Sequence, residues 1–173
     1  FTSLDLNKGF TRLESFIETS RGEINRLEYI ITQFLQAIRP TSPDRKPDQL
    51  NHVVLETLDL LRPELDNRNI ELVKELDSDL PDTPFDRSQV KQVFVNLIKN
   101  AMQAITNGGV LTIRTKSEVE GVLVSIEDNG AGIPSERIGR IFEPYFTTKK
   151  KGTGLGLMIV HRIIRDHGGR IMV

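Results

Sequence analysis

The chain has 173 residues, 38% of them apolar, which is enough for one compact domain and an additional element. Lys and Arg number 23 and Asp and Glu 24, so a net charge of -1 gives no general attraction for nucleic acid or an anionic membrane surface. The absence of cysteine excludes disulfides and thiolate metal sites. No apolar run approaches the roughly 18 residues that a membrane-spanning helix needs. We expect a cytoplasmic fragment that contacts neither nucleic acid nor membrane, whether or not the longer protein is anchored in a membrane.

The first forty residues carry a helical pattern with a continuous apolar stripe. Its members follow alternating steps of three and four, with Ser20 in one polar slot, at Phe10, Leu13, Ile17, Ile24, Leu27, Ile31, Phe34 and Ile38. This spacing predicts a long bundle-forming helix that ends at Pro40 and Pro43. One helix cannot bury the stripe alone, so we expect a homodimer through the 10–39 helix. The alternative is a helix packed on its own globular domain.

A polar, proline-containing linker over 40–48 predicts a domain boundary, with one region at 1–40 and a second at 41–173. In the second region the periodicity predicts three helices and three strands, joined by a turn-rich connection over 80–85 and a loop-rich stretch over 130–154. The helices are expected at 50–65, 86–105 and 155–167, and the strands at 70–76, 110–116 and 122–128. Residues 170–173 read as a strand cut short. This order favours an α+β fold, a two-layer sandwich of a mixed, mostly antiparallel sheet with helices on one face.

The second of these helices carries two asparagines, Asn96 and Asn100, one turn apart on the same face. An amide oxygen is a hard neutral ligand that can complete a Mg²⁺ shell, and an amide nitrogen can donate to a phosphate oxygen. Taken alone, the pair is equally typical of a solvated helix face.

A turn with two glycines follows the last expected strand. It contains Asp128, Gly130, Gly132 and Ile133. A carboxylate fixed at a strand end can accept from the exocyclic amino group of adenine and would repel the carbonyl of guanine. The glycines allow the main chain to approach a flat ligand. Such a turn is also common in ordinary hairpins.

An irregular stretch over 142–151 combines aromatic, hydroxyl and basic side chains. They are Phe142, Tyr145, Phe146, Thr147, Thr148, Lys149, Lys150 and Lys151. Aromatic residues can anchor a loop while hydroxyl and ammonium groups face anionic oxygens. The alternative is a basic surface turn with an apolar plug.

Alternating glycines lead directly into the third expected helix, at Gly152, Gly154 and Gly156, with Thr153 and Leu155 between them. Main-chain N–H groups at such a helix start can bind phosphate. No G-K-[ST] follows, so this is not a Walker loop.

These four stretches, in this order, resemble the N, G1, F and G2 boxes of the histidine kinase branch of the superfamily that also holds gyrase and a heat-shock chaperone. The resemblance covers residues 86–173. Residues 24–40 are similar to the second helix of that family's dimerisation and phosphotransfer domain. The nitrogen-regulation subgroup is the most similar, on residues 100–105 and 142–149. The resemblance implies a Bergerat-type ATP-binding fold that is part of a bacterial sensor histidine kinase.

The resemblance also implies a role for each motif residue. Asn100 would bind Mg²⁺, Asn96 the phosphates or the water shell of the ion, and Asp128 the adenine amino group. Gly130 and Gly132 would shape the base pocket, with Ile133 covering the base. The ATP-binding residues implied in the last two boxes are Phe146, Thr148, Lys149, Gly152, Thr153, Gly154, Leu155 and Gly156. Residues 134–153 would form a mobile lid, docked to the body by Phe142 and Phe146.

The resemblance further implies a choice of reaction and of partners. Gyrase-like relatives carry a glutamate base where this chain has Asn96, so we expect phosphoryl transfer to a histidine rather than hydrolysis, with relay to the Asp of a response regulator. None of His52, His161 and His167 fits the acceptor position, so we expect this chain not to phosphorylate itself. An ATP-hydrolysing relative and a degenerate dimeric scaffold are the alternatives.

Overall fold

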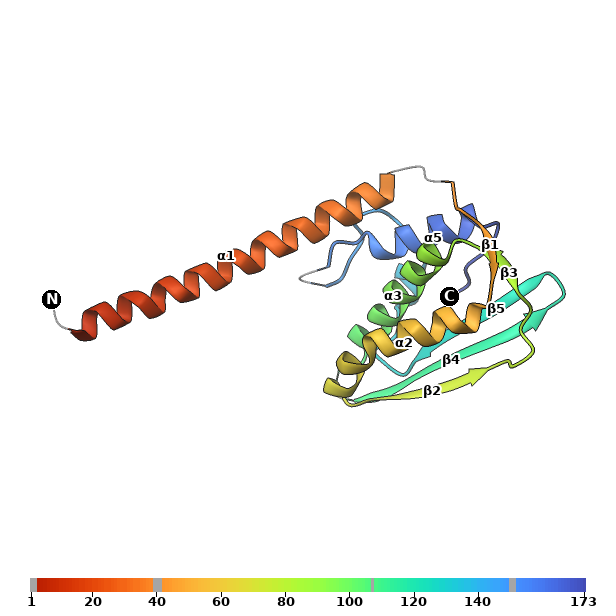
Figure 1. Cartoon of the computed structure of the whole chain (residues 1–173), viewed down its shortest axis with the longest axis horizontal. Helices are drawn as coiled ribbons and strands as arrows, with labels where there is room; N and C mark the ends of the chain where they lie inside the picture. The colour runs from red at the N-terminus through yellow and green to blue at the C-terminus, as the bar shows by residue number, and fades with distance from the viewer. Residues whose placement is uncertain (1–2, 39–41, 107, 150–151) are drawn as a thin grey trace. The chain divides into compact units, whose positions relative to one another are not determined.

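The computed structural model describes residues 3–38, 42–106, 108–149 and 152–173 (Figure 1). The chain divides into two compact units, Phe1–Arg39 and Pro40–Val173, and each is described by itself. Among the described residues, no helix is both long enough and apolar enough to cross a membrane.

The first unit is a single helix, α1 (Ser3–Ile38), of 36 residues. At a rise of 1.5 Å per residue it is about 54 Å long. The described members of the apolar stripe are open to solvent: Leu13, Ile17 and Ile24 are each 58% exposed, and Phe34 is 40% exposed. The side chains of Phe10 and Ile38 lie outside the described part. The helix thus confirms the periodicity, and the described members of the stripe are exposed in this chain.

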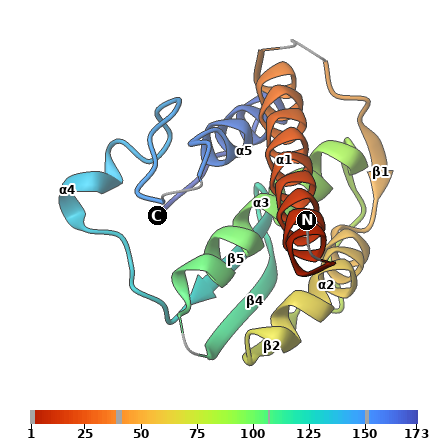
Figure 2. The same ribbon diagram turned by 90° about the vertical axis from the view of Figure 1, so that its left-hand side faces the viewer.

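The second unit is a two-layer α+β sandwich, as predicted (Figures 1 and 2). A three-stranded sheet has the order β2-β4-β5, with β2 parallel and β5 antiparallel to the central strand β4. Three helices cover one face of this sheet. The elements are β2 (Ile70–Leu76), β4 (Gly109–Glu118), β5 (Gly121–Asp128), α2 (Leu50–Asn67), α3 (Arg87–Ala104) and α5 (Gly156–Asp166).

The core lies between the sheet and the helices because β4 alternates in polarity. Leu111 and Ile113 are fully buried under the helices. Arg114, the residue after Ile113, points to the opposite face of the sheet. Thr115 is buried too, and its hydroxyl donates to Asn51 Oδ1 over 2.8 Å and accepts the Asp77 N–H over 3.0 Å. The fully buried helical side chains that close the core include Val53, Val54, Leu65, Ile98, Met102, Ile159, Val160 and Ile163.

Two short strands lie where the sequence predicted only a polar linker and a turn-rich connection. β1 (Lys46–Asp48) pairs antiparallel with β3 (Thr83–Phe85), so the end of the predicted linker and the end of the 80–85 connection are ordered against each other. Each strand has three residues and a central proline, Pro47 or Pro84, which removes the alternation that marks a strand in sequence.

The segment that leads into the second unit, at residues 44–45, is hydrogen-bonded to the start of α3 and to the end of α5. The Asp86 carboxylate caps α3 by accepting from the N–H groups of Ser88 and Gln89, and it also accepts the Asp44 N–H over 3.1 Å. The Arg45 guanidinium donates to the carbonyl of Asp166 at the end of α5. His167 bridges the same two ends. Its Nε2 accepts the Asp86 N–H over 3.0 Å, and Nδ1 lies 2.8 Å from the Ile163 carbonyl.

Two further segments differ from the sequence expectation. The loop after β5 contains a one-turn helix, α4 (Ser135–Ile138), and Figure 2 shows this segment leaving the sheet and returning to α5. Residues 170–173 have no regular structure, so the strand expected there is not formed. A strand needs a hydrogen-bonded neighbour, and none of the described strands pairs with this segment.

Candidate functional site

Asn96 and Asn100 are half-buried residues of α3, and Asn96 lies next to Gly156 at the start of α5. Asn96 is only partly buried as a residue, but its Nδ2 atom is buried and has no hydrogen-bond partner within the described part of the chain. Its Oδ1 lies beside Gly156, where an added Cβ would be 3.7 Å away. An unpaired buried donor costs free energy, so this amide is suited to an acceptor that is not part of the chain.

The start of α5 offers further donors at the same place. The side chain of its N-cap residue, Leu155, accepts no hydrogen bond from the helix. Within the described part of the chain, the first N–H groups of α5 are therefore not capped by this side chain and can donate to a ligand. The Thr153 hydroxyl accepts the Leu155 N–H over 3.3 Å and shapes the turn. The Leu155 side chain itself is 2% exposed and belongs to the core, which leaves only its main chain available to a ligand.

Lys149 connects the irregular stretch to the asparagine helix. Its ammonium donates to Asn100 Oδ1 over 2.9 Å and to Gln103 Oε1 over 2.5 Å. Lys149 is exposed as a residue, but desolvation of its ammonium group against α3 lowers its pKa, and the negative charge of Asp128 acts in the opposite direction. The ammonium therefore lies within the electrostatic reach of the carboxylate at the end of β5.

The glycine turn after β5 packs against the end of α3. The Asp128 carboxylate accepts the Gly130 N–H over 2.9 Å, and the Ala131 N–H donates to the Ala104 carbonyl over 3.2 Å. A Cβ on Gly130 would lie 2.5 Å from the carbonyl carbon of Ala104, so this glycine is required for packing inside the protein. Gly132 instead has a positive φ of 68° with open space around it, and Ile133 is 46% exposed.

The lid (residues 134–153) contacts the body through Phe142, one of the two predicted aromatic anchors. Phe142 packs on the His161 ring of α5 with a centroid separation of 5.2 Å. The Phe146 ring lies under the Arg140 guanidinium, 4.7 Å away, and its docking on the body stays a prediction. Ile141, 7% exposed, is a second anchor that the sequence analysis missed.

The lid and the glycine-rich turn are also joined through their main chains. The Tyr145 N–H donates to the Gly154 carbonyl over 3.0 Å. Both residues have a positive φ, 63° for Tyr145 and 69° for Gly154, and a Cβ on Gly154 would lie 2.6 Å from the Tyr145 Cα. A Cβ added to Gly152 would overlap with Thr147 Oγ1 and lie 3.2 Å from the Cβ of Lys149, and Thr148 is exposed to solvent. Lys150 and Lys151 lie outside the described residues.

The donor set fits a metal ion that arrives with its own ligands. In the described part of the chain, no three His, Cys, Asp or Glu side chains gather to hold a metal. Asn100 Oδ1 is a hard oxygen ligand, and the remaining ligands of a Mg²⁺ ion would have to be phosphate oxygens and water.

The residues of this site lie in a region that matches a known protein family. Residues 85–173, more than half of the chain, match the family model described as "Histidine kinase-, DNA gyrase B-, and HSP90-like ATPase". The chain belongs to this ATPase family. The match begins just before α3 and takes in all the residues that meet around Asn100.

Among the members of the ATPase family, the similar proteins are histidine kinases. Sporulation kinase E of Bacillus subtilis is 32% identical over 98% of this chain and 25% of its own length. The catalytic domain of histidine kinase ThkA is 36% identical, with a TM-score of 0.65 over 70% of this chain and 80% of that one. Histidine kinase ThkA in complex with response regulator protein TrrA matches with 31% identity and a TM-score of 0.75, over 91% of this chain and 45% of that one. The second unit is thus a histidine kinase catalytic domain by family and fold.

The chain spans only 25% to 36% of the length of the curated relatives that it matches. The region that matches this chain is therefore only one part of each of those relatives.

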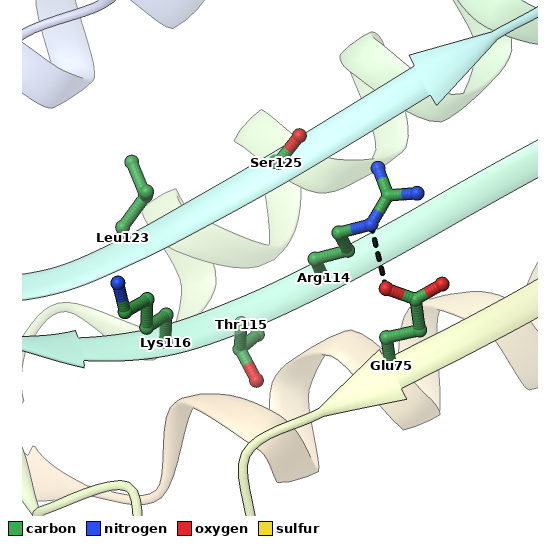
Figure 3. Close-up of a pocket in the computed structure, with 6 residues that line it drawn as sticks. All are labelled: Glu75, Arg114, Thr115, Lys116, Leu123 and Ser125. Carbon is green, nitrogen blue, oxygen red and sulfur yellow. Dashed lines mark hydrogen bonds and ion pairs between the residues drawn. The ribbon is translucent and has the colours of Figure 1, made fainter.

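A hollow of about 250 Å³ lies elsewhere, on the sheet face turned away from the helices (Figure 3). Arg114 crosses it between two carboxylates, 2.6 Å from Glu75 Oε2 and 2.5 Å from Glu127 Oε2. No residue that the sequence analysis singled out lines this hollow, so it is separate from the site around Asn100.

Gln103 is the main site residue that the sequence analysis missed. It follows Asn96 and Asn100 at the spacing i, i+4, i+7, so extending the helical face by one turn would have included it. The contact with Lys149 itself has no signal in the sequence, because the two residues are 46 positions apart.

Proposed function

We propose that this chain is the nucleotide-binding part of a sensor histidine kinase, which binds ATP with Mg²⁺ and transfers the γ-phosphoryl group to a histidine. In this proposal residues 41–173 are the catalytic domain, and residues 1–40 are part of the dimerisation and phosphotransfer domain. The phosphoryl group then passes to an aspartate of a response regulator. Family membership and the similarity to ThkA, which was solved in complex with TrrA, support this assignment.

The observation that carries the proposal is the meeting of four distant stretches at one place. Lys149 of the lid bonds to Asn100 and lies in the field of Asp128, while Gly156 lies against Asn96. An acidic group, two amides, an ammonium and an uncapped helix start are complementary to the base, the metal-bound phosphates and the anionic end of one nucleotide. Separate surfaces for these groups would have argued against a single ligand.

Each group has a role that its chemistry supports. Asp128 accepts from the adenine amino group, with Gly130, Gly132 and Ile133 around the base. Asn96 donates from its unpaired amide to phosphate oxygens. The main chain from Gly152 to Gly156 contributes N–H donors, and Thr148 and Phe146 belong to the lid that closes over them.

The same groups favour transfer over hydrolysis. Mg²⁺, when bound at Asn100, would neutralise charge on the phosphates and leave the transfer to positioning. Asn96 cannot remove a proton from water, because an amide is not a base at neutral pH. ATP is then preserved until a histidine is presented. ATP hydrolysis is the second candidate function, and the amide of Asn96 in place of a base argues against it.

The remaining parts of the proposal concern assembly and placement. The exposed stripe of α1 supports a homodimer through the 10–39 helix. The proposal also places the domain in the cytoplasm and assigns the chain to the nitrogen-regulation subgroup of histidine kinases.

A nucleotide titration tests the proposal. With Mg²⁺ present, the chain should bind ATP in preference to GTP, and Asp128→Ala should reduce the ATP affinity at least about thirtyfold, the loss of roughly 2 kcal/mol from a charged hydrogen bond. Circular dichroism should show the same helix content in both proteins. Unchanged ATP affinity in Asp128→Ala would remove the base-pocket assignment, and steady phosphate release by the unsubstituted chain would favour an ATPase.

A further inference from the structure

The ammonium of Lys149 is held by two neutral oxygens of α3. The distances are 2.9 Å to Asn100 Oδ1 and 2.5 Å to Gln103 Oε1, and the two acceptors lie almost one helical turn apart. Gln103 is exposed and has no part in the roles assigned above. Neutral amide acceptors bind an ammonium less strongly than a carboxylate would, so this contact can exchange.

Lys149 and a metal ion cannot both use Asn100 without strong repulsion. A Mg²⁺ ion lies about 2.1 Å from its oxygen ligands. With the ammonium 2.9 Å from the same oxygen, the two cations would be no more than about 5 Å apart. Loading of the metal at Asn100 must therefore move Lys149, while its second acceptor, Gln103, remains available.

We infer that Gln103 is a positioning residue, which retains the Lys149 ammonium at the phosphate end of the site when Asn100 binds the metal. The lysine then exchanges one amide oxygen for a phosphate oxygen and keeps the other. Gln103 contributes through Lys149 and only for ligands that carry a phosphate chain. This inference rests on the proposed function, and it identifies which of the three neighbouring lysines meets the phosphates.

A double-mutant cycle tests the inference on the full chain. Gln103→Met keeps the length and helix propensity of the side chain but removes the acceptor oxygen, and Lys149→Met removes the ammonium. Affinities for ATP and for adenosine, both with Mg²⁺, are measured by calorimetry for the two single variants and the double variant. Lys116→Met, on the outer face of the sheet, is the control for loss of one positive charge.

Gln103→Met should weaken ATP binding about tenfold and leave adenosine binding unchanged. In the Lys149→Met background the same substitution should have no further effect, because its partner is already absent. Additive losses, equal losses for adenosine, or an unchanged ATP affinity in Gln103→Met would each overturn the inference. Failure of the unsubstituted chain to bind ATP would instead refute the proposed function.

Discussion

Substitution of Gly154 by alanine tests whether the contact between the lid and the glycine-rich turn is needed for nucleotide binding. The added Cβ would lie 2.6 Å from Tyr145 Cα and 2.7 Å from its carbonyl oxygen, both main-chain atoms that cannot rotate away. Alanine at a φ of 69° costs roughly 1–2 kcal/mol in addition, and overpacking costs roughly 1–3 kcal/mol. The conformation that joins Tyr145 to Gly154 should therefore lose at least about 2 kcal/mol, a factor of about thirty in its population.

We expect Gly154→Ala to bind ATP at least about thirtyfold more weakly, with faster hydrogen exchange of the lid amides. The urea midpoint should change little, because residues 143–145 and 147–149 are exposed and contribute little to the core. Gly139→Ala is the matched control in the same lid, since Gly139 has a φ of -64° and nothing within 4 Å of an added Cβ. Gly132→Ala separates strain from overlap, because its φ is 68° in open space. Equal ATP affinities for Gly154→Ala and Gly139→Ala would refute the reasoning.

Two other perturbations report on stability. Asn96→Leu removes a buried donor that has no partner among the described residues, so it should raise the free energy of unfolding by about 1 kcal/mol while ATP binding is lost; a lower urea midpoint would contradict this. Asp77 accepts from the N–H groups of Ser117 and Asp79, and these bonds hold the pKa of its carboxyl below the usual value. Because the folded-state pKa is the lower one, this stabilisation is present above about pH 4 and lost as the pH falls through the folded-state value. The urea midpoint, measured at pH values from 7 to 3, should decrease below about pH 4. Asp77→Asn should make this decrease smaller.

The long periodic elements were predictable from the residues themselves. The stripe of α1, the apolar face of α3 and the alternation of β4 have periods that only one element type satisfies, and the structure confirms each of them within a few residues of the expected bounds, apart from the earlier start of α1 at Ser3. Asp86 likewise has the residue type and position of an N-cap, although it was assigned to the helix itself.

The short elements and the lid contacts were not predictable in the same way. β1 and β3 exist only because 46–48 and 83–85 meet in space, and their prolines conceal any pattern. The contact of the Arg140 guanidinium with the Phe146 ring, six residues later, has no signal in the sequence, because the lid has no regular period that would place the two side chains together. Three lysines in a row carry the same charge, so no sequence argument could show that Lys149 reaches Asn100.

The hydrogen bond from the Arg45 guanidinium to the Asp166 carbonyl ties the segment that leads into the second unit to the C-terminal end of α5. α5 has 11 residues and is about 16 Å long, too short to bend appreciably. Its buried side chains Ile159, Val160 and Ile163 fix it in the core along its length. One short helix therefore joins the segment that leads into the second unit, at Asp166, to the glycine-rich turn beside Asn96, at Gly156.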